Sequence, residues 1–348
     1  MKRIALLLSS FLFLLSACSP GSDEPQTLTI MTHDSFAVSE AVIQSFEEQN
    51  NAEVVFLQSG DAGSVLNRAI LTREAPLADL LFGVDNTFLS RALEADIFEP
   101  YASAALENIP AEFQLDPSNR ALPVDYGDVC INYDKAYFAE NNLPVPQSLG
   151  DLTEPEYAGL LVVENPATSS PGLAFLLATV AHFGDSYLDF WRALKENDVV
   201  VVDGWETAYY ANFSGSSGRG PQPMVVSYGT SPAAEVIFAE TPLDDAPTAS
   251  ILGPGTCFRQ IEFVGILQGT ENRALAERLV DFMLGEPFQE DVPLQMFVYP
   301  VNPEAALPDA FVQYAQAPEQ PATLAPEEIA ANRDRWIREW TDVVLNQE

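Results

Sequence analysis

Apolar residues in the first hundred positions follow two alternating periods, which predict alternating strands and helices. Short apolar runs have the length and composition of buried strands, and the segments between them carry apolar side chains at the spacing of one helix face. The predicted strands cover residues 28–32, 52–58 and 78–85, and the helices between them cover 34–51 and 64–74. This order predicts parallel strands in an α/β layer architecture.

The alternation changes after Tyr126 and resumes as a second series. Strands are predicted at 128–138, 159–166 and 257–270, strand–helix units at 199–213 and 224–238, and helices at 88–101, 173–184, 272–293 and 327–345. The chain therefore leaves a first unit near Tyr126, builds a second unit, and returns near Ile261.

Two crossings of this kind predict two lobes, each a mixed sheet flanked by helices, joined by a hinge of two strands. We expect residues 27–127 plus 258–348 to form the first lobe and residues 128–257 to form the second. Ligands of such folds bind at strand carboxyl ends and helix N-termini, often between domains. The sequence thus predicts a cleft between the lobes.

The N-terminal sequence is typical of a secretion signal. Two basic residues precede an apolar run over 4–15 that is too short to span a bilayer. The run ends in "LSAC" at 15–18, which resembles the lipobox of bacterial lipoproteins, where the signal is cut before a cysteine that receives a diacylglycerol. We expect a signal peptide and lipid-anchor Cys18 over 1–18, a polar tether over 19–26, and a mature protein held outside the cytoplasmic membrane. Ordinary signal cleavage beside an incidental cysteine is the alternative.

Composition narrows the classes of partner. The 348 residues include 51 acidic residues against 16 Lys and Arg, a formal net charge of -35. Such a charge repels phosphate backbones, so nucleic acid is a poor partner and we expect none. Hydrophobic residues make up 47% of the chain, which is enough for a sizeable core. We expect a monomer.

Two cysteines remain besides Cys18. Cys130 and Cys257 lie in predicted strands near the two crossings. Disulfides persist outside the cytoplasm, so two thiols there favour one bridge, which we expect to join the adjacent hinge strands. Two separate buried thiols are the alternative.

One predicted helix N-terminus carries only small side chains and prolines. The segment "NPATSSPG" at 165–172 precedes an apolar helix. Ser170 is expected to cap this helix, Pro171 suits its first turn, and Gly172 leaves the backbone uncovered. Free amides at a helix start bind anions or hydroxyls. This helix N-terminus is therefore either a ligand-binding site or an ordinary helix cap.

Several segments together resemble one family. "MTHDSF", "ADLLFGVDN", "NPATSSPGLAFLL", "GWETAY", "VVSYGTSPA" and "YPVNP" are similar in sequence and order to the thiamine-binding proteins of bacterial ABC importers, within the extracytoplasmic solute-binding proteins. The resemblance implies a two-lobe periplasmic-binding-protein fold of class II. It also implies capture of thiamine, alone or as its phosphates, and delivery to a membrane permease powered by a cytoplasmic ATPase, with no chemistry on the ligand.

The resemblance also implies site residues. Asp61, Ser169, Trp205 and Tyr228 match the family's pocket positions, and Ser170 and Gly172 flank Ser169. An aromatic face over the thiazolium cation contributes about 0.5–2 kcal/mol. Asp85 is a further candidate to balance the cation.

Three positions depart from the family pattern. His33 replaces a pocket tyrosine, Ala234 replaces a stacking tyrosine, and Phe297 replaces a tryptophan. His33 and Phe297 are still expected to face the ligand. The stacking surface should therefore be smaller, with weaker thiamine affinity or acceptance of a related cation.

Other solutes remain open. Ferric-iron relatives use two adjacent tyrosines where this chain has Tyr228-Gly229. Tyr209-Tyr210 is an adjacent pair, but it lies in a predicted helix, half core and half surface. A polyamine is favoured by the acidity.

An enzyme is the alternative of another class. His33 and His182 are the only histidines, and the sequence contains no nucleophile elbow, metal-spaced His/Cys cluster or phosphate loop. Thiamine-degrading enzymes use a cysteine, whereas Cys130 and Cys257 lie in strands. We expect no catalysis, no cofactor and no metal. A structural lipoprotein without a ligand is a third reading.

Overall fold

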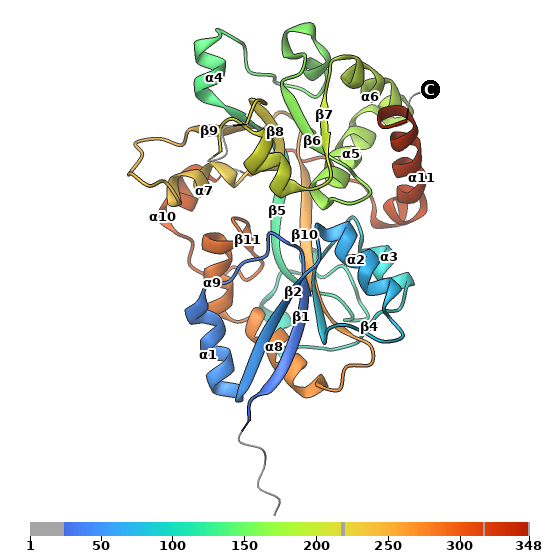
Figure 1. The fold of residues 1–348 in the computed structure, drawn as a ribbon, viewed down its shortest axis with the longest axis vertical. Coiled ribbons are helices and arrows are strands. Elements are labelled where there is room, and N and C mark those ends of the chain that lie inside the picture. The colour runs from blue at the N-terminus through green and yellow to red at the C-terminus, as the bar shows by residue number, and fades with distance from the viewer. Residues whose placement is uncertain (1–23, 217–219, 316, 347–348) are drawn as a thin grey trace, which may run out of the picture.

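The computed structural model describes residues 24–216, 220–315 and 317–346. The predicted signal peptide, Cys18 and most of the tether lie outside these residues. The strands form one curled 11-stranded sheet whose main path runs β2-β1-β3-β10-β5-β8-β6-β7. Figure 1 shows two lobes, one above the other, with β5 and β10 passing between them.

The first lobe confirms the predicted β-α-β-α-β alternation. Its β1 strand pairs in parallel with both β2 and β3, and every residue of β3 is buried, which explains the uninterrupted apolar run there. The elements are β1 (Gln26–Thr32), α1 (Glu40–Asn50), β2 (Ala52–Gln58), α2 (Ala62–Leu71), β3 (Leu80–Asp85), α3 (Leu89–Glu94), β4 (Phe98–Glu99), η1 (Ala104–Asn108) and η2 (Ala111–Phe113).

The first helix starts later than predicted. Residues 34–39 form an irregular segment before α1, because the Phe36 side chain packs in the hydrophobic core. Its ring lies 5.0 Å from that of Phe82 on β3. The tertiary contact of Phe36 therefore outweighs the local helical pattern.

Two long antiparallel strands, β5 (Leu122–Asp134) and β10 (Phe258–Leu267), connect the lobes. They pair with each other from Val129 and Phe258 to Leu122 and Val264. β10 also pairs with β3 of the first lobe, and β5 also pairs with β8 of the second. Each strand thus belongs to both lobes, as expected of a two-strand hinge.

The second lobe is built around α5, which is buried on almost every face. Its elements are α4 (Lys135–Glu140), η3 (Gly150–Thr153), η4 (Pro155–Tyr157), β6 (Leu161–Glu164), α5 (Ser170–Phe183), η5 (Gly184–Ser186), α6 (Tyr187–Glu196), β7 (Val200–Val202), η6 (Thr207–Asn212), β8 (Met224–Tyr228), α7 (Ser231–Ile237) and β9 (Thr248–Ile251). The η6 segment is one π-helical stretch.

The chain ends with α8 (Arg273–Met283), α9 (Glu286–Gln295), β11 (Tyr299–Pro300), α10 (Asp309–Tyr314) and α11 (Pro326–Val344). The single helix predicted at 272–293 is two helices, because Gly285 has an extended backbone and starts α9. Figure 1 shows α11 beside α6, and the Trp340 ring packs edge-on against Trp191 at 5.5 Å. The predicted lobe boundaries remain a prediction. Helix α11 lies in the range that was assigned to the first lobe, but it packs against the second lobe.

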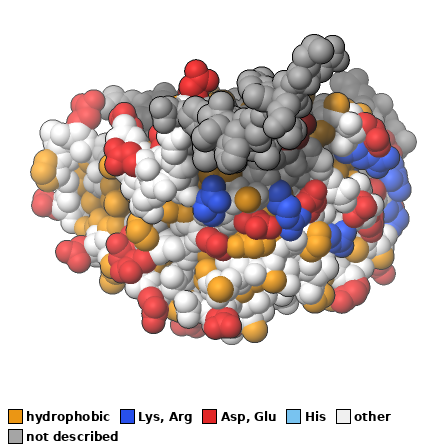
Figure 2. Space-filling view, turned by 90° about the horizontal axis from the view of Figure 1, so that it is seen from below, with side chains coloured by type: hydrophobic (Ala, Val, Ile, Leu, Met, Phe, Trp, Pro, Cys, Tyr) orange, Lys and Arg blue, Asp and Glu red, His pale blue; other side chains and the backbone are white. Residues whose placement is uncertain are grey.

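The surface reflects the acidic composition. Figure 2 shows Asp and Glu side chains spread over the face seen from below, with Lys and Arg gathered in its central and right-hand part. Within the described residues, no helix has the length and apolar character needed to cross a membrane.

Candidate functional site

A cavity of about 270 Å³ lies between the two lobes. It opens at the carboxyl ends of β1, β7 and β8 and at the starts of α2 and α5, where such folds are expected to bind ligands. Its lining combines carboxylates, hydroxyls and aromatic rings: His33, Ser35, Ala37, Asp61, Ala62, Ser170, Pro171, Trp205, Glu206, Tyr210, Tyr228, Ser231, Phe238, Gln260, Glu262, Gln295, Met296, Phe297 and Val298.

Six of the nine predicted ligand residues line this cavity. They are His33, Asp61, Ser170, Trp205, Tyr228 and Phe297. The other three, Ser169, Gly172 and Asp85, are buried behind its wall, where they hold the lining residues in place.

Asp61 begins α2 and reaches both lobes. Its carboxylate accepts hydrogen bonds from the amide of Ala62 at 2.6 Å and from the amide of Trp205 at 3.0 Å. Burial raises the pKa of Asp61, and these two amide bonds oppose that rise. The carboxylate is thus fixed at the cavity wall by donors from opposite sides.

Trp205 and Tyr228 form an aromatic wall in the second lobe. Trp205 stacks on Tyr209 with ring centroids 5.0 Å apart, and its Nε1 donates to Ser227 Oγ at 2.9 Å. The Tyr228 ring lies edge-on to Trp205 at 6.4 Å. A Cβ at Gly127 would lie 2.8 Å from the Tyr228 ring, so a glycine is needed there for the tyrosine to lie flat along the strand. Both aromatic rings are therefore held in one position.

The entrance of α5 differs in detail from the prediction. Ser169, not Ser170, is the N-cap, because Ser169 has the extended backbone and its Oγ accepts from the amide of Gly172 at 3.5 Å. Ser170 instead donates its hydroxyl to Asp85. A Cβ on Gly172 would lie 2.5 Å from the carbonyl oxygen of Glu164, so this position requires glycine for close helix–strand packing.

Asp85 supports the N-terminus of α5 through its hydrogen bond with Ser170. It accepts bonds from Thr87 Oγ1 at 2.7 Å and from the amides of Thr87 and Phe88 at 3.1 and 3.2 Å. Burial raises the pKa of Asp85 to about 6, against the lowering effect of its hydrogen bonds to Ser170 and Thr87. Asp85 lies behind Ser170, where it can hold the Ser170 side chain at the cavity wall.

A chain of titratable groups extends from the cavity into the hinge. His33 Nε2 lies 3.6 Å from Glu262 Oε1, and Glu262 lies directly across the β5–β10 pair from Asp125. Burial lowers the His33 pKa, but the contact with Glu262 and the negative charges of Asp61 and Asp34 together outweigh burial and raise that pKa. Burial, reinforced by Glu262, raises the pKa of Asp125 well above its usual value.

The sequence reasoning missed several lining residues. Glu262 had a signal, since a lone acid in the apolar strand "QIEFVGIL" needs a partner. Tyr210, the half-exposed member of the Tyr209–Tyr210 pair, and Phe238 also face the cavity. Phe238 packs edge-on against Phe297 at 5.0 Å. Tyr210 and Phe238 therefore add aromatic surface to the cavity.

Phe297 occupies its position with a left-handed backbone, φ 59°. Phenylalanine rarely adopts this conformation, and such strain persists only where the surroundings determine it. The turn points the Phe297 ring into the cavity, which no local sequence pattern indicates.

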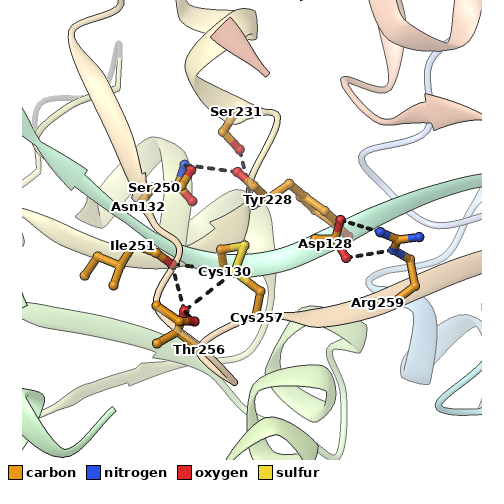
Figure 3. Close-up of a disulfide and its surroundings, with 11 residues drawn as sticks. Asp128, Cys130, Asn132, Tyr228, Ser231, Ser250, Ile251, Thr256, Cys257 and Arg259 are labelled. Carbon is orange, nitrogen blue, oxygen red and sulfur yellow. Dashed lines mark hydrogen bonds and ion pairs between the residues drawn. A yellow bond between two sulfur atoms is a disulfide. The ribbon is translucent and has the colours of Figure 1, made fainter. Parts of the chain in front are cut away.

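Cys130 and Cys257 form a disulfide with Cα atoms 4.3 Å apart. Figure 3 shows the bridge between β5 and the start of β10, beside the Arg259–Asp128 ion pair. Arg259 Nε and Nη2 donate to the two Asp128 oxygens at 2.7 and 2.9 Å. The bridge and the bidentate pair together fix the register of the hinge strands.

Two observations concern the side chains that could bind a metal ion. The described residues contain no group of three or more His, Cys, Asp or Glu side chains able to hold a metal ion. Tyr228 is followed by Gly229 at the cavity, and Tyr209 is buried against Trp205 and Phe213. An adjacent tyrosine pair does not face the cavity.

Comparison with known proteins places the chain in a family. Residues 75–319 match the model of the bacterial extracellular solute-binding proteins, and the chain belongs to this family. The thiamine-binding periplasmic protein of Brucella suis biovar 1 (strain 1330) is 31% identical over 97% of this chain and 98% of its own length. The protein of the same name from Escherichia coli (strain K12) is 31% identical over 97% of this chain and 99% of its own.

Solved structures of periplasmic binding proteins have the same overall fold as this chain. A periplasmic thiamin binding protein superposes with a TM-score of 0.81 at 28% identity, covering 94% of this chain and 98% of its own. The apo ferric ion-binding protein A of Pasteurella haemolytica superposes with a TM-score of 0.72 at 20% identity, covering 92% and 99%. The latter shares the fold alone. The predicted two-lobe periplasmic-binding fold is therefore confirmed.

Proposed function

We propose that this protein captures thiamine outside the cytoplasmic membrane and delivers it to an ABC import permease and its ATPase. The observation that carries the proposal is that Asp61, Trp205 and Tyr228, from three separate elements, line one cavity between the lobes. The names of the full-length relatives support the choice of ligand.

The chemistry of the cavity suits a flat organic cation. Asp61, Glu206 and Glu262 supply negative charge, and Trp205 and Tyr228 supply aromatic faces, each worth about 0.5–2 kcal/mol against a cation. The two lobes enclose the ligand, so binding must favour the closed arrangement over an open one.

Calorimetric titration of the mature protein tests this proposal. We expect one thiamine per chain and no competition from ferric citrate or spermidine at equal concentration. Tighter binding of spermidine or ferric citrate would replace thiamine with that solute. Mass spectrometry of gently purified protein adds an independent readout, because a co-purified ligand identifies itself by mass.

The protein binds its ligand as a monomer without altering it, and Cys18 carries the lipid that holds it at the membrane. Purified protein incubated with thiamine should return it unchanged, and measurable turnover would make it an enzyme. Replacing Cys18 with Ser should release the protein from the membrane fraction, whereas Cys130→Ser should not.

A further inference from the structure

His33 is the one basic side chain among the described residues that line the cavity. It follows β1 in the first lobe, and its ring lies against Phe82 with ring centroids 5.6 Å apart. A Cβ on Gly83 would lie 2.3 Å from His33 Cδ2, so this glycine leaves the space that the imidazole occupies. The His33 ring is therefore held in one position at the cavity wall.

The two nitrogens of the His33 ring have different surroundings. Nδ1 is bonded to Ser35 Oγ at 2.9 Å, and Nε2 lies 3.6 Å from Glu262 Oε1. That distance is too long for a hydrogen bond, and the buried Nε2 has no hydrogen-bond partner among the described residues. The attraction between His33 and Glu262 therefore depends on charge, and it exists only while the imidazole carries a second proton.

In the described part of the chain, the charged groups that act on His33 are all acidic. They are Glu262 of β10, Asp61 at the start of α2, Asp34 next to His33 in sequence, and Glu206 after β7. Burial lowers the pKa of His33, but the contact with Glu262 and the charges of Asp61 and Asp34 raise it above its ordinary value. Near neutral pH, the proton on His33 thus offsets part of the negative charge around the cavity.

An organic cation in the cavity is attracted by the same carboxylates. Because His33, Asp61 and Glu262 line one cavity of about 270 Å³, a bound cation and a protonated His33 lie close together and repel each other. We propose that His33 is an internal cation that competes with the ligand for the carboxylates of the site, so that capture of the ligand expels the His33 proton. This inference rests on the proposed function, and it adds that one residue makes binding depend on pH.

The direction of the pH dependence follows from linkage. If binding expels a proton, a higher pH must strengthen binding, because fewer protons remain to be expelled. The affinity for thiamine should rise by up to about tenfold from about pH 6 to about pH 8.5, which corresponds to a His33 pKa about one unit lower in the complex than in the free protein. At a pH well above the His33 pKa of the free protein, the affinity should become constant.

Calorimetric titration with thiamine at several pH values tests the inference. Titrations at one pH in buffers of different ionisation enthalpy also count the protons released for each ligand bound. We expect the wild-type protein to release a fraction of one proton near neutral pH, and His33→Gln to remove that release and flatten the pH profile. Any proton exchange of the ligand itself remains in the variant, so the difference between the two proteins belongs to His33. His182→Gln is the matched control, because His182 is the other histidine of the chain and is exposed near the end of α5.

Direct titration of the imidazole by NMR is a second readout that needs no substitution at His33. Spectra of the wild-type protein with and without thiamine give the His33 pKa in each state, and His182→Gln assigns the signals of the two histidines. We expect the His33 pKa to fall when thiamine binds. An unchanged His33 pKa would refute the proposal even if His33→Gln failed to fold.

The outcomes separate the two proposals. If thiamine binds with an affinity that does not change with pH, or if the pH dependence persists in His33→Gln, the role of His33 is refuted while thiamine binding stands. If spermidine binds in place of thiamine, the choice of ligand fails, and the same pH criterion applied to spermidine decides the role of His33. If neither cation binds, both proposals fail.

Discussion

The backbone amide of Trp205 donates a hydrogen bond to the carboxylate of Asp61 across the cavity, at 3.0 Å. Asp61 starts a helix of the first lobe and Trp205 follows a strand of the second. The residue that supplies charge to the site therefore also joins the lobes. Ligand affinity and lobe closure should be linked through this one carboxylate.

Asp61→Asn is expected to weaken thiamine binding about 10- to 100-fold, because the variant removes a charge and weakens the hydrogen bond from Trp205. The amide oxygen can still cap α2, so the folded structure should persist. Titration calorimetry measures the affinity, and Glu53→Gln serves as the neutral comparison. An affinity equal to that of wild type would mean that Asp61 does not face the bound cation.

Gly83→Ala is expected to destabilise the protein by about 3 kcal/mol. Gly83 has φ +97°, and a Cβ there would lie 2.3 Å from His33 Cδ2, so the added methyl group displaces the His33 ring from the cavity. Urea unfolding measures the change. Gly150→Ala, where the nearest atom is 3.7 Å away, should change stability by less than about 0.5 kcal/mol, and similar losses in both variants would contradict the steric argument.

Removal of the disulfide is expected to cost about 3–5 kcal/mol of unfolding free energy, because the bridge closes a long loop in the unfolded chain. Cys130 and Cys257 are 127 residues apart in sequence. The single variants Cys130→Ser and Cys257→Ser and the double variant should lose similar amounts, since each breaks the same bond. A double variant as stable as wild type in denaturant titration would show that the bridge does not constrain the unfolded state.

Stability is expected to depend on pH through Asp85. Burial raises the pKa of Asp85 from 3.8 to about 6, so the folded state binds this proton more tightly than the unfolded state does. The contribution of Asp85 is complete below pH 4 or so and is lost as pH rises through about 6. The shift corresponds to about 3 kcal/mol.

Asp85→Asn isolates this effect, because asparagine resembles the protonated acid and keeps an acceptor for Thr87. We expect the unfolding free energy of the variant, relative to wild type, to increase by about 3 kcal/mol between pH 4 and pH 8. Urea unfolding at several pH values provides the measurement. A difference that stays constant with pH would mean that Asp85 titrates normally in the folded protein.

The sequence predicted the fold well because the main signals are local or periodic. Buried β3 is an unbroken apolar run, and α5 is apolar on nearly all faces. The crossings at β5 and β10 followed from the change of pattern near Tyr126 and Ile261. The break between α8 and α9 was missed because Gly285 is a single residue inside a continuous helical pattern.

The site was predicted less completely. Asp61, Trp205 and Tyr228 were expected at the site because they match pocket positions of the family that the sequence resembles. Glu262 escaped detection because its role depends on contacts across the hinge. Phe297 was expected at the site from the family resemblance, but its left-handed backbone was not. Ser169 and Ser170 exchanged roles, because neighbouring serines both have cap chemistry and only the backbone angles distinguish them.

The last helix adds a constraint on how the lobes move. After β11 the described chain returns to the second lobe, where α11 packs on α6, and Arg333 of α11 donates to Ser90 of α3 at 3.2 Å. The polypeptide thus passes between the lobes a third time, after β11, which pairs with β5. A third connection restricts the twisting of one lobe against the other more than two strands alone would. Opening of this protein should therefore be mainly a swing, with the Arg333–Ser90 contact sliding or breaking.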